Sequence, residues 1–110
     1  MPVQARVKLD ALVSDFGSQA RVADVLEVDR SRVSRWLKGE QPDAENSAKL
    51  DGVEFVLSRL LGRYQPQTAL KWLQGINPQL GDRRPVDLIR SGRVAEVLEA
   101  VETDLADAYA

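Results

Sequence analysis

The sequence predicts an all-α protein in which several short helices flank one long central helix. Apolar residues recur at intervals of three and four, which is the spacing of a helix that buries one face. Stretches that alternate apolar and polar residues, as a half-buried strand would, are too short to be useful. Glycine, proline, serine and aspartate fall between the apolar stretches, where helices begin and end. These observations favour helices throughout the chain.

Four helices are expected in the first part of the chain. Gly17 ends the first helix, and Ser18 and Asp29 stand where the second and third helices need an N-terminal capping residue. Gly39 closes the third helix, and a loop containing proline separates it from the fourth. The expected helices span residues 9–16, about 19–26, 30–38 and about 44–64.

The fourth and longest helix carries an apolar stripe and one residue that does not belong to it. The stripe runs from Leu50 to Tyr64 and lies within about 100° of the helix circumference at the 3.6-residue period. Phe55 lies on the opposite side. A large aromatic residue outside the main stripe indicates a second contact, either with another element of the chain or with another copy of it. Phe55 and the adjacent Val56 are therefore candidate dimerisation residues.

The second part of the chain is expected to form a smaller helical unit. Residues 65–68 (QPQT) are the expected seam before it. In the turn that follows its first helix, Asn77 can bond its own backbone and Gly81 can adopt the left-handed conformation. Pro85 suits the first position of a helix, and Gly92 suits the end of one. The two expected units are residues 1–64 and 65–110, and the helices of the second unit span residues 69–74, 85–90 and 93–108.

The composition excludes several classes of chemistry. The chain has 110 residues with no histidine and no cysteine, so a zinc finger, a Ser-His-Asp triad and a disulfide framework are all impossible. An enzyme built on carboxylates such as Asp82 and Asp87 is disfavoured, because nothing nearby in sequence would raise a pKa or bind a cofactor. We expect no enzymatic activity, no cofactor and no metal. Because charges at Arg6, Lys8 and Asp10 interrupt the first apolar residues, we expect neither a signal peptide nor a membrane span, and a cytoplasmic protein.

Charge is distributed unevenly along the chain. The formal net charge is −2, from 15 basic and 17 acidic residues. Residues 94–110 hold five acids and no base, which leaves residues 1–93 with a net charge of +3. The densest basic stretch, residues 30–38, holds four bases and no acid. This distribution permits an anionic partner at the third helix although the whole chain is acidic.

The run from Ser18 to Gly39 resembles the helix-turn-helix of the Xre and Cro repressor family. Ala23 is small where two helices cross, and Val28 fills the turn. Val33, together with Trp36 or Leu37, anchors the second helix so that its other face points outward. In the second helix of the chain, the buried residues are expected to be Ala20, Ala23 and either Val22 or Leu26.

The resemblance implies that the second helix of the motif lies in the major groove of operator DNA. It places Arg30, Ser31 and Arg35 at positions that read bases, and Gln19 and Arg32 near the DNA backbone. Glu27 stands at a turn position that often holds glycine, so the turn must either be strained or adopt another geometry. The alternative is an ordinary three-helix bundle with a solvated basic face. The predicted DNA-binding residues are Gln19, Arg30, Ser31, Arg32, Ser34, Arg35 and Lys38.

Residues 65–100 look like the toxin-binding domain of the Xre/MbcA/ParS-like antitoxins. The ordered set Trp72-Leu73, Asn77-Pro78, Leu80-Gly81, Pro85, Asp87-Leu88 and Gly92 carries this resemblance, and each piece also has a role in folding the unit. The resemblance implies a cognate RES-domain toxin, which consumes NAD or transfers ADP-ribose from it. The predicted toxin-binding residues are Trp72, Arg83, Arg84, Asp87, Arg90, Arg93, Glu102, Asp104, Asp107 and Tyr109.

The acidic C-terminal helix has two interpretations. An acidic helix could occupy the anion-binding cleft in which a toxin holds the pyrophosphate of NAD. Asp104 and Asp107 lie near the end of the helix, where the helix dipole disfavours negative charge, so helix stability does not explain them. The alternative is a frayed, solubilising tail. Tyr109 could anchor a partner surface or pack on Val101 or Leu105.

Two functions therefore compete. In the first, the chain is an antitoxin that occludes the active site of a RES toxin and represses its own operon, as a homodimer or as a larger complex with the toxin. In the second, it is a stand-alone transcriptional repressor whose C-terminal unit serves dimerisation only. The gene next to this one discriminates between them, because only the first function requires a neighbouring toxin gene.

Overall fold

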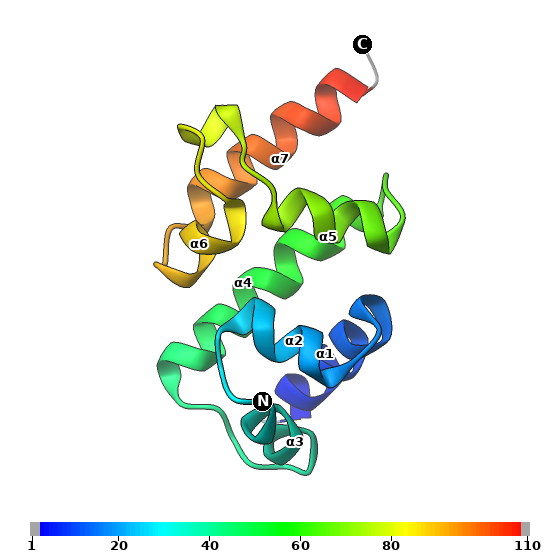
Figure 1. Cartoon of the computed structure of the whole chain (residues 1–110), viewed down its shortest axis with the longest axis vertical. Coiled ribbons are helices and arrows are strands. Elements are labelled where there is room, and N and C mark those ends of the chain that lie inside the picture. Colours follow the sequence, from blue (N-terminus) through cyan, green and yellow to red (C-terminus); the bar gives the residue numbers. More distant parts are fainter. Residues whose placement is uncertain (1–2, 109–110) are drawn as a thin grey trace. The chain divides into compact units, whose positions relative to one another are not determined.

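The computed structural model describes residues 3–108, and these residues form an all-α fold (Figure 1). Within them there are seven α-helices, one short 3-10 helix (η1) and no β-strand. The predicted fold class is confirmed. None of the helices in this part of the chain is both long enough and apolar enough to cross a membrane.

The chain divides into two compact units, residues 1–54 and residues 55–110. The division falls inside the long helix α4 (Ala44–Leu61), not at residues 65–68 as the sequence analysis expected. The reason is that the apolar stripe of α4 serves both units. Leu50 and Val53 are buried in the first part of the helix, and Leu57 and Leu60 are buried in the second part.

The first unit is built from α1 (Val3–Phe16), α2 (Gln19–Leu26), α3 (Arg30–Leu37) and the start of α4. Helix α1 begins six residues before the expected start at Leu9, because polar residues on an exposed face do not interrupt a helix. In α2, Ala20 is exposed, which corrects the expectation that it is buried. Both Val22 and Leu26 are buried, since they share one face with Ala23.

Helices α2 and α3 begin differently, although both have a capping residue at the expected position. Ser18 caps α2 as predicted, because its hydroxyl accepts a hydrogen bond from the backbone N–H of Arg21 at 3.2 Å. Asp29 stands at the N-cap of α3 but makes no side-chain capping bond there. The expectation that the carboxylate of Asp29 caps α3 is therefore wrong. Its backbone carbonyl accepts the first helical bond from Arg32.

The turn between α2 and α3 contains a strained residue. Glu27 adopts the left-handed conformation, with φ 57° and ψ 51°. Its backbone N–H and that of Val28 close the end of α2 by donating to the carbonyls of Asp24 and Ala23. Of the two possibilities left open by the sequence, the structure adopts the strained turn. Left-handed backbone costs a residue with a β-carbon about 1–2 kcal/mol, a cost that glycine avoids.

The second unit holds α5 (Pro66–Gln74), η1 (Pro78–Leu80), α6 (Pro85–Arg90), α7 (Val94–Ala108) and the end of α4. The predicted turn chemistry is confirmed: the Asn77 side chain accepts from the backbone N–H of Gln79 at 2.9 Å, and Gly81 has φ 68°. Pro85 occupies the first position of α6, as expected. Residues from α5, α6 and α7 form the core of this unit, including Leu73, Val86, Ile89, Val97 and Val101.

The strained turn gives a stability prediction. We expect Glu27→Gly to raise the free energy of unfolding by about 1 kcal/mol relative to Glu27→Ala, because only the glycine variant removes the β-carbon from left-handed backbone. Urea denaturation of the full chain measures both. The alanine variant is the matched control, since it removes the same carboxylate without relieving the strain. Equal stability of the two variants would show that the turn stores no strain.

Candidate DNA-contacting and partner-binding surfaces

The outer face of α3 presents the basic residues that the sequence analysis assigned to DNA. Val33 and Trp36 are buried on the inner face of α3, while Leu37 is only half-buried. Trp36, not Leu37, therefore anchors the helix together with Val33. Ser34, on α3, and Gln19, the first residue of α2, are half-buried. The exposed residues of the face are Arg30, Ser31, Arg32, Arg35 and Lys38.

Among the described residues, Arg35 forms an ion pair with Glu40. Its Nε lies 3.4 Å from a carboxylate oxygen of Glu40, and the Arg35 side chain remains 49% exposed. Exposed ion pairs of this kind contribute little to stability. The protein therefore loses little stability when Arg35 leaves Glu40 to bind another hydrogen-bond acceptor. The guanidinium of Arg35 can therefore bind a new acceptor without a large loss.

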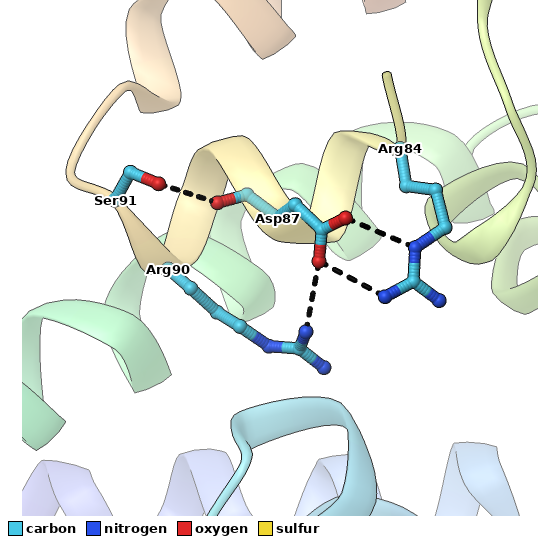
Figure 2. Close-up of polar contacts among 4 residues, drawn as sticks. All are labelled: Arg84, Asp87, Arg90 and Ser91. Atoms are coloured by element: carbon cyan, nitrogen blue, oxygen red, sulfur yellow. Dashed lines mark hydrogen bonds and ion pairs between the residues drawn. The ribbon is translucent and has the colours of Figure 1, made fainter. Parts of the chain in front are cut away.

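A network around Asp87 organises the arginines of α6 (Figure 2). Arg84 donates to both carboxylate oxygens of Asp87, from Nε and Nη2, each at 3.0 Å. Arg90 donates from Nη1 to the same carboxylate, also at 3.0 Å, and its side chain is only 12% exposed. The hydroxyl of Ser91 donates to the backbone carbonyl of Asp87 at 2.8 Å. Asp87 thus fixes the direction of two guanidinium groups.

The same network keeps Asp87 ionised. The hydrogen bond from Arg84 lowers the pKa of Asp87 most, the charges of Arg84 and Arg90 lower it further, and partial burial opposes them. An acid held in this way cannot serve as a proton donor near neutral pH. Its role is to position Arg84 and Arg90.

Arg83 and Arg93 converge on Glu96 at the start of α7. Arg93 donates to Glu96 from Nη2 at 2.8 Å, and Nη2 of Arg83 lies 3.8 Å from the same carboxylate. Arg83 also donates from Nε to the carbonyl of Leu80 at 2.7 Å. The hydrogen bond from Arg93 is the main cause of a lowered pKa for Glu96. The four arginines predicted to contact a toxin therefore form two groups, with Arg84 and Arg90 on Asp87 and with Arg83 and Arg93 on Glu96.

A groove of about 530 Å³ lies beside these arginines, and Ile76 forms part of its wall together with Arg83, Arg84 and Arg93. Ile76 is 70% exposed. Ile76 was not among the predicted site residues, although an isoleucine inside a turn of polar residues and glycine is a usable signal. Trp72 is half-buried and lines a second, smaller groove with Ile76, so this isoleucine separates the two.

The acidic residues of α7 differ in whether they already have a partner within the described chain. Arg59 donates from Nη2 to Glu102 at 2.6 Å and also from Nε at 3.0 Å. The hydroxyl of Tyr64 donates to Asp104 at 2.6 Å. Asp104 therefore ties α7 to the segment that follows α4, which corrects the view that stability does not explain it.

Asp107 and Tyr109 are the other two predicted toxin-binding residues at the C-terminal end. Asp107 is exposed, and among residues 3–108 it has no hydrogen-bond or ion-pair partner. Tyr109 lies outside the described residues, so its assignment stays a prediction.

The two candidate dimerisation residues also differ. Phe55 is 53% exposed, so within the described residues it is not covered by another element of the chain. Val56 is fully buried and offers no surface to a second copy. The assignment of Val56 to a dimer contact is wrong for this reason, and Phe55 alone remains a candidate.

The chain was compared with known proteins. It is 32% identical over 109 residues to the probable mycobacterial cidal antitoxin Rv3188 of Mycobacterium tuberculosis (strain H37Rv), and the aligned region covers 97% of this chain and 92% of that protein. The chain belongs to the MbcA-like antitoxin family. No family model and no solved structure matches. The aligned region extends over almost the whole chain and therefore spans both units.

The lowered pKa of Asp87 predicts how the stability of this MbcA-like chain depends on pH. A carboxylate with a lower pKa in the folded state stabilises that state above its unfolded pKa, and the contribution disappears as the pH falls through the folded pKa. We expect Asp87→Asn to be less stable than the unaltered chain at about pH 7, and we expect this difference to shrink as the pH falls through the folded pKa of Asp87. Urea denaturation across this range measures the difference.

The matched control for this prediction is Asp10→Asn. Asp10 is exposed and has no ion-pair partner within residues 3–108. Its variant removes an exposed carboxylate that belongs to no ion pair of the described residues, so it measures the effect of the substitution itself. A stability difference for Asp87→Asn that does not change with pH would contradict the proposed charge network.

Proposed function

We propose that the chain neutralises a cognate RES-domain toxin and also binds operator DNA, so that it represses its own operon. The observation that carries the antitoxin role is the similarity to a probable antitoxin along almost the whole chain. The resemblance of residues 65–100 to the toxin-binding domain of Xre/MbcA/ParS-like antitoxins extends the proposal to a toxin that consumes NAD or transfers ADP-ribose.

The deciding experiment is coexpression with the product of the adjacent gene. The two proteins should copurify, and NAD loss caused by the partner should stop when this chain is present. A neighbouring gene product that neither copurifies nor consumes NAD would favour the alternative, a stand-alone repressor.

The basic face of α3 supports the DNA-binding part of the proposal. Base edges in the major groove accept bidentate hydrogen bonds from arginine, and phosphates attract basic side chains of either type. A single helix-turn-helix makes few contacts, so two copies about 34 Å apart are normally needed. Phe55 is the proposed contact between those copies, because a half-exposed aromatic residue gains from burial.

The second unit supports the toxin-binding part of the proposal. Exposed Ile76 beside a group of arginines combines an apolar anchor with charged hydrogen-bond donors, which is a common composition for the centre of a protein interface. Asp107 and the residues after it are the proposed occupants of the toxin cleft. Glu102 and Asp104 have intrachain partners, so they contribute to neutralisation by positioning α7.

Two substitutions on α3 separate base reading from phosphate binding. We expect Arg35→Ala to lose selectivity for the operator over other sequences, because a bidentate contact to guanine is worth about 1–3 kcal/mol of discrimination. We expect Lys38→Ala to weaken binding to all sequences and to reduce the salt slope by about one unit. Fluorescence anisotropy with operator and scrambled duplexes at several salt concentrations measures both. Uniform loss for Arg35→Ala would contradict its role in reading bases.

Two truncations test whether the C-terminal end blocks the toxin. Removing residues 107–110 keeps the contacts of Glu102 and Asp104, so we expect the truncated chain to copurify with the toxin but to leave its NAD-consuming activity largely intact. Removing residues 102–110 also breaks the contacts with Arg59 and Tyr64, and should in addition weaken copurification. Tyr64→Phe is the control that loosens α7 without removing an acid. Full protection by the shorter truncation would contradict the blocking role.

A further inference from the structure

The groove of about 530 Å³ in the second unit, the arginine groove, combines an apolar wall with unused hydrogen-bond donors. Ile76 in its wall is 70% exposed, more than any other large apolar side chain of the described residues. A guanidinium carries five donors. Within residues 3–108, Arg83 makes one hydrogen bond, to Leu80, and Arg93 makes two, both to Glu96. The arginine groove can therefore bind a further carboxylate on donors that the fold does not use.

The charges of the arginine groove favour an acidic occupant. Its lining holds three bases and two acids, which are Arg83, Arg84, Arg93, Asp82 and Asp87. The carboxylate of Asp87 already accepts hydrogen bonds from Arg84, so it does not compete for Arg83 and Arg93. A carboxylate from outside therefore meets a net positive lining. The arginine groove of a second copy is not such an occupant, because it carries charge of the same sign.

The end of α7 supplies a matching carboxylate that cannot reach the arginine groove of its own chain. Asp107 is exposed and has no side-chain partner within residues 3–108. Arg83 and Arg93 are both held at Glu96, which lies eleven residues before Asp107 on the same continuous helix. A helix rises about 1.5 Å per residue, so this separation is about 16 Å. Figure 1 shows the last turns of α7 extending away from α6. Only another copy can bring the two groups together.

We propose that copies of this chain associate by placing the end of α7 of one copy in the arginine groove of the other. The carboxylate of Asp107 then binds Arg83 and Arg93, and the adjacent exposed Ala106 packs against Ile76. The same contact in the opposite direction fills both grooves and closes a two-fold pair. The pair needs neither toxin nor DNA. One consequence rests on the proposed function: a toxin that takes up the end of α7 must first displace the second copy.

Sedimentation equilibrium of the full chain without toxin tests this proposal. The measurements use a Phe55→Ser background, because Phe55 is the other proposed contact between copies and its side chain is exposed. We expect a monomer–dimer equilibrium that shifts to monomer as salt increases, because exposed charges carry part of the contact. Asp107→Asn should raise the dimer dissociation constant about tenfold, as for the loss of two exposed ion pairs, one at each end of the dimer.

A matched control and a mixing experiment make the test specific. Glu99→Gln removes an exposed acid of the same helix two turns before Asp107, and should not weaken the dimer. Ile76→Asp places an acid in the groove wall and should also weaken it. Each variant keeps one half of the contact, since Ile76→Asp retains the acidic end and Asp107→Asn retains the groove. A mixture of the two should therefore form more dimer than either variant alone.

Three results would overturn the proposal. The first is a background chain that stays monomeric at every concentration and salt. The second is equal weakening by Glu99→Gln and Asp107→Asn, which would assign the effect to net charge. The third is a mixture that associates no better than its separate components. Neutralisation of a toxin can succeed or fail independently of all three, because none of these measurements includes the toxin.

Discussion

Burial of one apolar face on each of two very short helices is the constraint on which the rest of the first unit depends. Helices α2 and α3 have eight residues each, and helices of this length do not persist alone in water. They exist because Val22, Leu26, Val33 and Trp36 are removed from solvent together. Because those residues face inward, the 3.6-residue period places the basic residues of α3 on its exposed side. The candidate DNA-contacting face is thus a consequence of packing.

In the second unit, charge pairs orient the surface residues that packing leaves exposed. Asp87 holds Arg84 and Arg90, Glu96 holds Arg93, and each pair involves residues close in sequence. Such pairs add little stability at the surface, but they reduce the number of directions that a long side chain adopts. A partner that binds these arginines therefore pays less of the entropic cost of ordering them. The charge pairs therefore preorganise these arginines.

Local features of the fold were predictable from sequence, and features that depend on distant residues were not. The Ser18 cap, the Asn77 turn and the start of α6 at Pro85 each follow from the chemistry of a few adjacent residues. Asp29 shows the limit of such rules, because a suitable residue at an N-cap does not oblige its side chain to cap.

In the candidate sites, too, the local features were predictable from sequence and the long-range contacts were not. The exposed face of α3 was predictable because helical periodicity assigns a face from sequence alone. The pairing of Glu102 with Arg59 joins residues 43 positions apart, and no local pattern indicates it. The exposure of Ile76 also depends on what packs nearby. For the C-terminal acids, this long-range pairing changes the argument: a toxin must compete with Arg59 for Glu102 and with Tyr64 for Asp104, whereas Asp107 offers its charge without a competitor among the described residues. Under the proposed blocking role, affinity for the toxin cleft should therefore depend most on the last turn of α7.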